Sequence, residues 1–187
     1  MQCAVTEEKT LTAESSAALP AAGENVLDIT GSFTAGSIVL AAGQASVKSL
    51  GVVAGWNRPA PLWQGDTWRL GLRHEAVLAA WHAPRARDLV EVGYTPVLRL
   101  QRPVADGQRV FFVEGGIGVR LLTHTRVSAE HRLSTAFQFA DMLGVGMQFG
   151  PQARSTLGLR LQHLSNLGIK RPNPGIDFMQ VYYSYRF

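Results

Sequence analysis

The sequence predicts an all-β protein, an eight-stranded antiparallel up-and-down barrel, and three observations indicate this fold. Successive runs of about ten residues alternate between apolar and polar side chains, as they do where neighbouring side chains of a strand point to opposite faces. Nineteen glycines spread among these short runs fit an antiparallel β protein better than a helical one. No stretch approaches the roughly 20 consecutive apolar residues of a membrane helix, so any membrane crossing must use strands.

The first block of the chain, residues 1–35, lacks the strand pattern and is predicted to be a flexible N-terminal segment. It is rich in Ala, Ser and Glu, a composition typical of a mobile tail. An exported barrel is expected to begin with a basic region followed by an apolar region, and this block has neither. Three interpretations stay open: a misassigned start, a segment that replaces a lost signal peptide, or a protein that is not exported. Residues 36–187 form the predicted barrel domain.

Eight strands are predicted in the barrel domain. Residues 36–43 and 47–56 are expected to form a hairpin across residues 44–46. Pro96 lies inside a later run and predicts a bulge or a missing hydrogen bond, because proline has no backbone N–H. A Pro-rich connection at residues 57–66 precedes the other predicted strands, which span residues 67–81, 89–101, 109–122, 137–149, 157–165 and 177–187.

Alternation alone does not say which face of the barrel is outside, since a soluble lipocalin-like barrel has its apolar face inward and a membrane barrel has it outward. Two features favour the outward, transmembrane arrangement. The opposite face combines glycines with charges of both signs, as suits paired charges in a narrow lumen, and aromatic residues lie near strand ends, as in membrane girdles. The charged residues are Arg69, Arg73, Glu75, Glu91, Arg99, Glu114, Arg120 and Arg160, and the aromatic residues are Trp63, Trp68, Trp81, Tyr183, Tyr185 and Phe187.

The net charge of +4 conceals an asymmetry, because residues 1–36 sum to −4 and the remainder carries +8. A basic body attracts anionic surfaces such as anionic lipid. No Lys/Arg run with interleaved aromatic residues is present, so nucleic acid is not an expected partner. The single cysteine, Cys3, excludes an internal disulfide.

Candidate chemistry lies in the last two predicted strands. His163 and Ser165 share the face of the leucines of their strand, and Asp177 shares the apolar face of the next strand. A hairpin would bring the three side chains together on one face. A serine hydroxyl needs an imidazole to accept its proton and a carboxylate to fix the tautomer of that imidazole. The His-x-Ser spacing is common by chance, so polar residues at a strand end are the alternative interpretation.

The segment HLSNLGIKRPNPGID, followed by a strand that ends in Phe187, resembles the signature of the lipid A 3-O-deacylase (PagL) family, which are outer-membrane barrel enzymes. A last strand with alternating aromatics and a final Phe also resembles the recognition signal of outer-membrane barrels. The resemblance implies that His163 is the base and Ser165 the nucleophile. It places the orienting acid at Asp177, where the family often has glutamate, so the shorter carboxylate must sit closer to the imidazole.

The resemblance further implies an enzyme, a serine-type carboxylic ester hydrolase that releases the 3-hydroxyacyl chain from position 3 of lipid A. The implied location is the bacterial outer membrane, crossed several times, with lipid A or lipopolysaccharide of the outer leaflet and membrane lipids as partners. Asn166, Gly168 and Asn173 match positions of the oxyanion region. Lys170 and Arg171 can pair with the phosphates of lipid A, with solvated loop charges as the equal alternative.

Neither a cofactor nor a metal is expected, because the remaining histidines lack ligand spacing. Two other functions stay open: a non-catalytic small outer-membrane barrel in structure or adhesion, and a soluble lipocalin-like carrier of a fatty ligand. A homodimer is an open option for the assembly. The histidines in question are His74, His82, His124 and His131.

Overall fold

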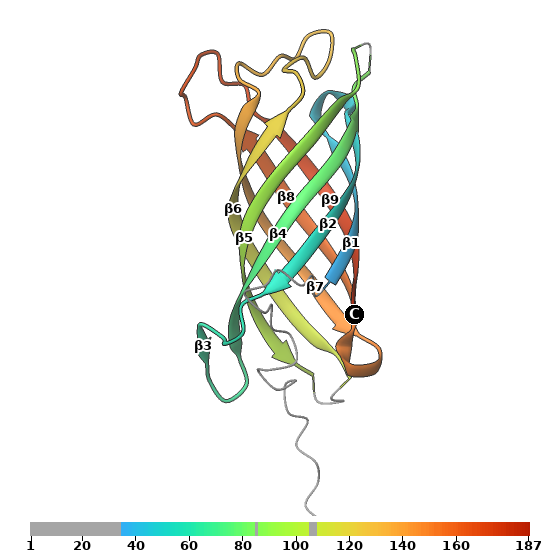
Figure 1. Cartoon of the computed structure of the whole chain (residues 1–187), viewed down its shortest axis with the longest axis vertical. Helices are drawn as coiled ribbons and strands as arrows, with labels where there is room; N and C mark the ends of the chain where they lie inside the picture. Colours follow the sequence, from blue (N-terminus) through green and yellow to red (C-terminus); the bar gives the residue numbers. More distant parts are fainter. Residues whose placement is uncertain (1–34, 85, 105–107) are drawn as a thin grey trace, which may run out of the picture.

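The protein is described by a computed structural model over residues 35–84, 86–104 and 108–187, and these residues form a closed antiparallel barrel (Figure 1). The strands follow one another around the barrel, β1 pairs with β9, and the pairing of β2 with β4 closes it. The short β3 adds only to the edge of β4. The predicted eight-stranded barrel is therefore confirmed. Its elements are β1 Ala35–Gly43, η1 Gln44–Ser46, β2 Lys48–Asn57, β3 Trp63–Gln64, β4 Arg69–His82, β5 Leu89–Pro103, β6 Val110–Leu122, β7 Phe137–Phe149, η2 Pro151–Ala153, β8 Ser155–Ser165 and β9 Ile176–Arg186.

The predicted N-terminal segment lies, apart from Ala35, outside the described residues. The predicted first hairpin is confirmed, with the 3-10 turn η1 between β1 and β2. Pro96 acts as expected on the ladder between β5 and β6. Pairing passes from Tyr94 opposite Val119 to Val97 opposite Gly116, so two residues of each strand are skipped. Equal numbers are skipped on both strands, so the proline removes hydrogen bonds without adding a bulge.

Apolar side chains cover the outside of the barrel wall. Alternate residues of the long strands are exposed and apolar, and the residues between them are buried. A soluble carrier would have the reverse arrangement, with its apolar face inward, so the wall suits lipid and not water. The most exposed of these wall residues include Ile38, Leu40, Leu50, Val52, Leu78, Ile117, Leu143, Leu159, Leu161 and Met179.

The predicted aromatic girdle is correct for five of its six members. Trp63, Trp68, Tyr183, Tyr185 and Phe187 are exposed, and they lie at the end of the barrel that carries β3 and the C-terminus (Figure 1).

The placement of the sixth girdle residue, Trp81, is wrong. Its side chain is 1% exposed, and its indole Nε1–H donates to Glu91 Oε2 at 2.6 Å inside the barrel. The physical reason is parity, because Trp81 is an even number of residues from the inward-facing Glu75 on the same strand. Proximity to a strand end does not determine the face on which a side chain lies.

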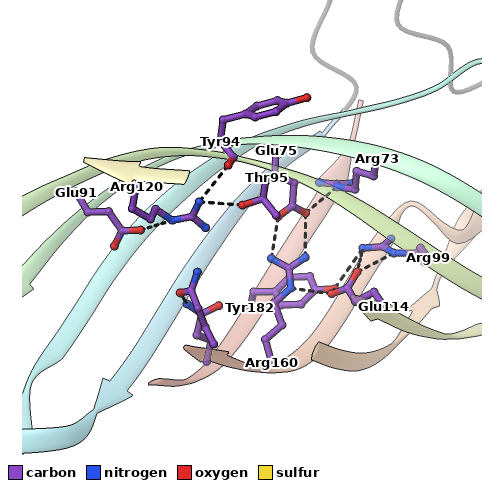
Figure 2. Close-up of polar contacts among 12 residues, drawn as sticks. Arg73, Glu75, Glu91, Tyr94, Thr95, Arg99, Glu114, Arg120, Arg160 and Tyr182 are labelled. Atoms are coloured by element: carbon purple, nitrogen blue, oxygen red, sulfur yellow. Dashed lines mark hydrogen bonds and ion pairs between the residues drawn. The ribbon is translucent and has the colours of Figure 1, made fainter. Parts of the chain in front are cut away.

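The middle of the lumen is filled by a network of buried ion pairs (Figure 2). Glu114 accepts hydrogen bonds from Arg99 Nη2 at 2.7 Å, from Arg160 Nε at 2.7 Å and from the hydroxyl of Tyr182 at 2.8 Å. Arg160 also donates two hydrogen bonds to Glu75, at 2.8 and 2.9 Å. The predicted pairing of opposite charges inside the barrel is thus confirmed. The ion pair Arg73–Glu75 shares its carboxylate with this network, and Arg120–Glu91 is a separate ion pair in the lumen.

An apolar cluster fills the barrel at the end away from the C-terminus. It combines inward-facing strand residues with Val127 and Leu133, which come from the connection between β6 and β7. No helix in the described part of the chain is long and apolar enough to span a membrane. The cluster consists of Val47, Ala79, Trp81, Leu89, Leu122, Val127, Leu133, Ala140, Leu164, Ile176 and Phe178.

Candidate active site

His163 and Asp177 meet on the outside of the barrel. They are direct cross-strand neighbours on β8 and β9, and His163 Nδ1 lies 2.5 Å from Asp177 Oδ1. Their side chains are 45% and 56% exposed, so the pair faces the surroundings of the barrel. The carboxylate accepts the Nδ1–H, which leaves the lone pair of the imidazole on Nε2. That is the tautomer that a general base needs.

Ser165 lies at the end of β8, two residues after His163 and therefore on the same face by alternation. It is paired with Phe139 of β7, and the residue as a whole is only 8% exposed. No residue of the described chain is hydrogen-bonded to its Oγ, and this includes His163. Hydrogen bonds between a nucleophile and its base often tighten only when substrate is bound. The structure therefore brings the predicted base and acid into contact and places the predicted nucleophile on the same face of β8, two residues from His163.

The inward-facing residues next to His163 and Asp177 on their strands anchor the site. Leu164 and Ile176 are fully buried, and Phe178 is 3% exposed. All three belong to the apolar cluster at this end of the barrel, where Phe178 packs edge-on against Trp81 at a ring-centroid distance of 4.7 Å. The close packing of such a core resists small displacements. The polar residues on the outside are thus carried by strands that are fixed from within.

The loop between β8 and β9 folds around Asn166, whose side chain is fully buried. Its Nδ2 donates to the carbonyl of Lys170 at 2.8 Å, and its Oδ1 accepts from the N–H of Gly168 at 2.9 Å. Its own N–H donates to Asn173 Oδ1 at 3.0 Å. Among the predicted oxyanion donors, the N–H groups of Asn166 and Gly168 are thus engaged within the loop. The Nδ2 of Asn173 has no hydrogen-bond partner among the described residues.

A second loop, between β6 and β7, braces this one. His131 Nε2 lies 2.7 Å from the carbonyl oxygen of Gly175, and Ser134 Oγ donates to the carbonyl of Pro172. Gly175 has φ +63°, and a Cβ added there would lie 2.7 Å from Cε1 of His163. The absence of a side chain at Gly175 therefore lets the loop pass directly against the imidazole of His163.

A groove of about 510 Å³ opens beside the His163–Asp177 pair on the outer wall. Leu143, Leu161 and Met179 line it, and these three side chains are exposed, apolar wall residues of β7, β8 and β9. A wall of this kind can hold an alkyl chain next to the imidazole, because both the chain and the wall are apolar.

The profile of the family described as lipid A 3-O-deacylase (PagL) matches residues 48–186 of this chain. The chain belongs to this family. The lipid A deacylase PagL of Bordetella bronchiseptica is 39% identical over 124 residues, which is 66% of this chain and 67% of the relative. The corresponding protein of Pseudomonas aeruginosa is 30% identical over 129 residues, which is 68% of this chain and 72% of the relative.

A solved structure of the family has the same architecture. The crystal structure of the outer membrane enzyme PagL superimposes with a TM-score of 0.75 at 26% sequence identity, and the match covers 82% of this chain and 99% of the solved one. The barrel and the outward-facing site described above are thus the framework of a PagL-family member.

Two residues near the His163–Asp177 pair do not follow from the sequence motif. Asp141 is the cross-strand neighbour of His163 on the β7 side, so the imidazole stands between two carboxylates. Its signal in the sequence is a single carboxylate among the apolar residues on one face of a strand. Gln44 contacts Asp177 across 133 residues of sequence, and no local pattern indicates that contact.

The remaining predicted positions lie on the surface of the loop. Lys170 and Arg171 are exposed there, close in sequence to the site. Among the described residues, no group of three or more His, Cys, Asp or Glu side chains is arranged to hold a metal ion.

Proposed function

We propose that this protein is an outer-membrane lipid A 3-O-deacylase that uses a Ser165–His163–Asp177 triad. The observation that carries the proposal is the hydrogen-bonded His163–Asp177 pair, which stands outward on an apolar wall with Ser165 on the same face. An imidazole held in this tautomer beside a serine is the arrangement of a serine esterase. Its position on the lipid-facing wall suits an ester that is itself embedded in a membrane.

In the proposed reaction, Ser165 Oγ attacks the carbonyl carbon of the ester at position 3 while His163 Nε2 takes the hydroxyl proton. Asp177 stabilises the imidazolium that forms. The tetrahedral intermediate then collapses, and His163 returns the proton to the departing sugar oxygen. Water hydrolyses the resulting acyl-serine with His163 again as base, and the 3-hydroxy fatty acid is released.

The loop between β8 and β9 supplies the groups that would hold the substrate. Asn173 is the favoured oxyanion donor, because its amide N–H₂ has no other partner among the described residues, whereas the N–H groups of Asn166 and Gly168 are engaged within the loop. Lys170 and Arg171 are exposed and positively charged, and we assign them to the phosphates of lipid A.

The proposed membrane orientation is based on the position of the loops. The described chain begins and ends at one end of the barrel, where Ala35 pairs with Arg186, and the loop between β8 and β9 lies at the other end (Figure 1). With the end of the barrel that carries the C-terminus on the periplasmic side, the site faces the outer leaflet, where lipid A resides. The groove at Leu143, Leu161 and Met179 then receives part of an acyl chain.

The proposal is tested by mass spectrometry of lipid A incubated in detergent with the folded protein and with its Ser165→Ala variant. We expect the wild type to remove one 3-hydroxyacyl chain and the variant to leave the spectrum unchanged. An unchanged spectrum from folded wild type would contradict the proposal and favour a non-catalytic barrel. Equal activity of both proteins would show that Ser165 is not the nucleophile.

A further inference from the structure

We propose that Gln44 is a positioning residue of the active site, which holds the carboxylate of Asp177 in the orientation that His163 requires. The inference rests on the proposed deacylase function and deepens it. Gln44 Nε2 donates to Asp177 Oδ2 at 2.8 Å, while the other oxygen, Oδ1, lies 2.5 Å from His163 Nδ1. Both oxygens of the carboxylate therefore have a partner, one from the turn η1 and one from the base.

A second hydrogen bond joins the same two residues. The backbone N–H of Asp177 donates to Gln44 Oε1 at 3.3 Å. The primary amide thus meets the N–H with its oxygen and the carboxylate with its nitrogen. If the amide were flipped, its N–H₂ would face the N–H of Asp177 and its oxygen would face the carboxylate. Both contacts would be repulsive, so the two hydrogen bonds fix the orientation of the amide. The side chain of Gln44 thus holds both the carboxylate and the backbone N–H of Asp177.

The fold fixes Gln44 at this position. The preceding residue, Gly43, is paired with Phe178 at the start of β9, and a Cβ at Gly43 would lie 2.5 Å from the ring of Phe178. The next anchor is Val47, which is fully buried, and its N–H donates to the carbonyl of Gln44 at 3.2 Å. The turn is therefore tied to β9 on one side of Gln44 and to the apolar cluster on the other.

Asp177 needs such a support because its side chain is 56% exposed on the outer wall. The other cross-strand neighbour of His163, Asp141, has no hydrogen bond to the imidazole among the described contacts. Without Gln44, one oxygen of Asp177 loses its donor, and the carboxylate is free to leave the plane of the imidazole. The geometry assigns Gln44 the role of keeping the acid aligned during proton transfer.

The test is a double-mutant cycle measured on lipid A in detergent with Gln44→Ala, Asp177→Asn and the double variant. We expect Gln44→Ala to lower kcat about 10- to 100-fold, in line with the loss of a hydrogen bond to a charged group, and to change KM less than about twofold. In the Asp177→Asn background, Gln44→Ala should lower kcat by less than about twofold, because Gln44 acts through the carboxylate.

A second substitution and a matched control complete the experiment. Gln44→Glu keeps the size of the side chain and an acceptor for the N–H of Asp177, but it replaces the donor with a second carboxylate, so kcat should fall at least as far as in Gln44→Ala. Gln152→Ala changes the glutamine of the other 3-10 turn, η2, at the opposite end of the barrel, and should leave kcat unchanged.

Each outcome decides a separate point. The inference would be overturned if both Gln44 variants had the kcat of the wild type. It would also be overturned if Gln44→Ala lowered kcat equally with and without the Asp177 carboxylate, which would indicate a general structural role. Folded wild type that releases no acyl chain would overturn the proposed function itself and this inference with it. Folding is read in every sample from the difference in gel mobility between unheated and heated protein.

Discussion

Two groups of charged residues, one inside the barrel and one outside, both consist of carboxylates bound by hydrogen-bond donors, but they differ in exposure and in the donors that bind them. Glu114 in the lumen is 2% exposed and receives hydrogen bonds from two arginines and a tyrosine. The side chain of Asp177 on the outer wall is 56% exposed and is bound by one imidazole and one amide. The lumen ion pairs join arginines to glutamates and contain no histidine, whereas the outer pair contains one. We infer that the first group maintains the fold and the second performs the chemistry.

The alternation of side chains along the strands separates the two groups. On β8, Arg160 and Gln162 point inward, while Leu161 and His163 point outward. The same strand therefore supplies a member of the lumen network and the proposed catalytic base, three residues apart. A one-residue shift in the register would exchange these faces. Loss of a group on one face should consequently affect activity and loss of a group on the other should affect stability.

The largest effect is expected from His163→Ala. Removal of the proposed base should lower kcat/KM by roughly 10³-fold or more, because no imidazole is then available to accept the proton of the serine hydroxyl. The unfolding midpoint in detergent should stay close to that of the wild type, since the side chain is exposed. Activity is measured by release of fatty acid from lipid A, and His82→Ala, an exposed histidine at the same end of the barrel, is the control.

Glu114→Gln tests the lumen side of the comparison. The change leaves Arg99 and Arg160 short of a buried negative charge and should cost about 3–5 kcal/mol of unfolding free energy. The activity of the fraction that folds should remain within about twofold of the wild type. Urea unfolding followed by gel mobility measures the first quantity, with the exposed Asp66→Asn as control. A stable but inactive Glu114→Gln protein would contradict the division between the two groups.

Gly175→Ala tests the contact between the loop and the imidazole on the outer side of the barrel. The added methyl group would lie 2.7 Å from Cε1 of His163 and 3.0 Å from the carbonyl oxygen of Leu164, at a φ of +63°. Displacement of the imidazole should lower kcat roughly 10- to 100-fold. Gly150→Ala is the matched control, because it has φ +76° but no atom closer than 4.0 Å to its Cβ. Equal kinetics of the two variants would show that contact with the imidazole is irrelevant.

The smallest effect is expected from Asp141→Asn. The carboxylate is adjacent to His163 in register but has no hydrogen bond to it among the described contacts. Its contribution is a charge interaction at an exposed position, so kcat/KM should change by no more than about fivefold. The kcat/KM of Asp177→Asn, measured on the same lipid A preparation, should be at least about tenfold lower than that of Asp141→Asn. Equal losses from both variants would mean that the two carboxylates act on the imidazole alike.

The barrel could be predicted from the sequence because its signal repeats along the chain. Each strand shows the two-residue period, and the polar face contains arginines and glutamates that pair in the lumen. The position of Trp81 near a strand end predicts a place in the girdle, but its parity with Glu75 places its side chain inside the barrel. Local periodicity thus predicted the faces more reliably than residue type.

The site could be predicted only where it follows from pairing within one hairpin. His163 and Asp177 lie on consecutive strands, and the turn between them makes them neighbours. Gln44 reaches Asp177 only because the barrel closes between β1 and β9, and a contact produced by closure has no local signal. The engagement of the N–H of Gly168 by Asn166 also depends on how the loop folds, so the proposal of Asn173 as the oxyanion donor rests on the folded loop and not on the sequence pattern.

The most direct test of the account is covalent labelling with an alkyl fluorophosphonate, a reagent that modifies activated serine hydroxyls, followed by peptide mass spectrometry. We expect folded protein to take up a single label, on Ser165, and the Glu114→Gln variant, once folded, to be labelled at the same rate. Folded wild type that remains unlabelled, or that carries the label on another residue, would contradict the claim that the outer face performs the chemistry.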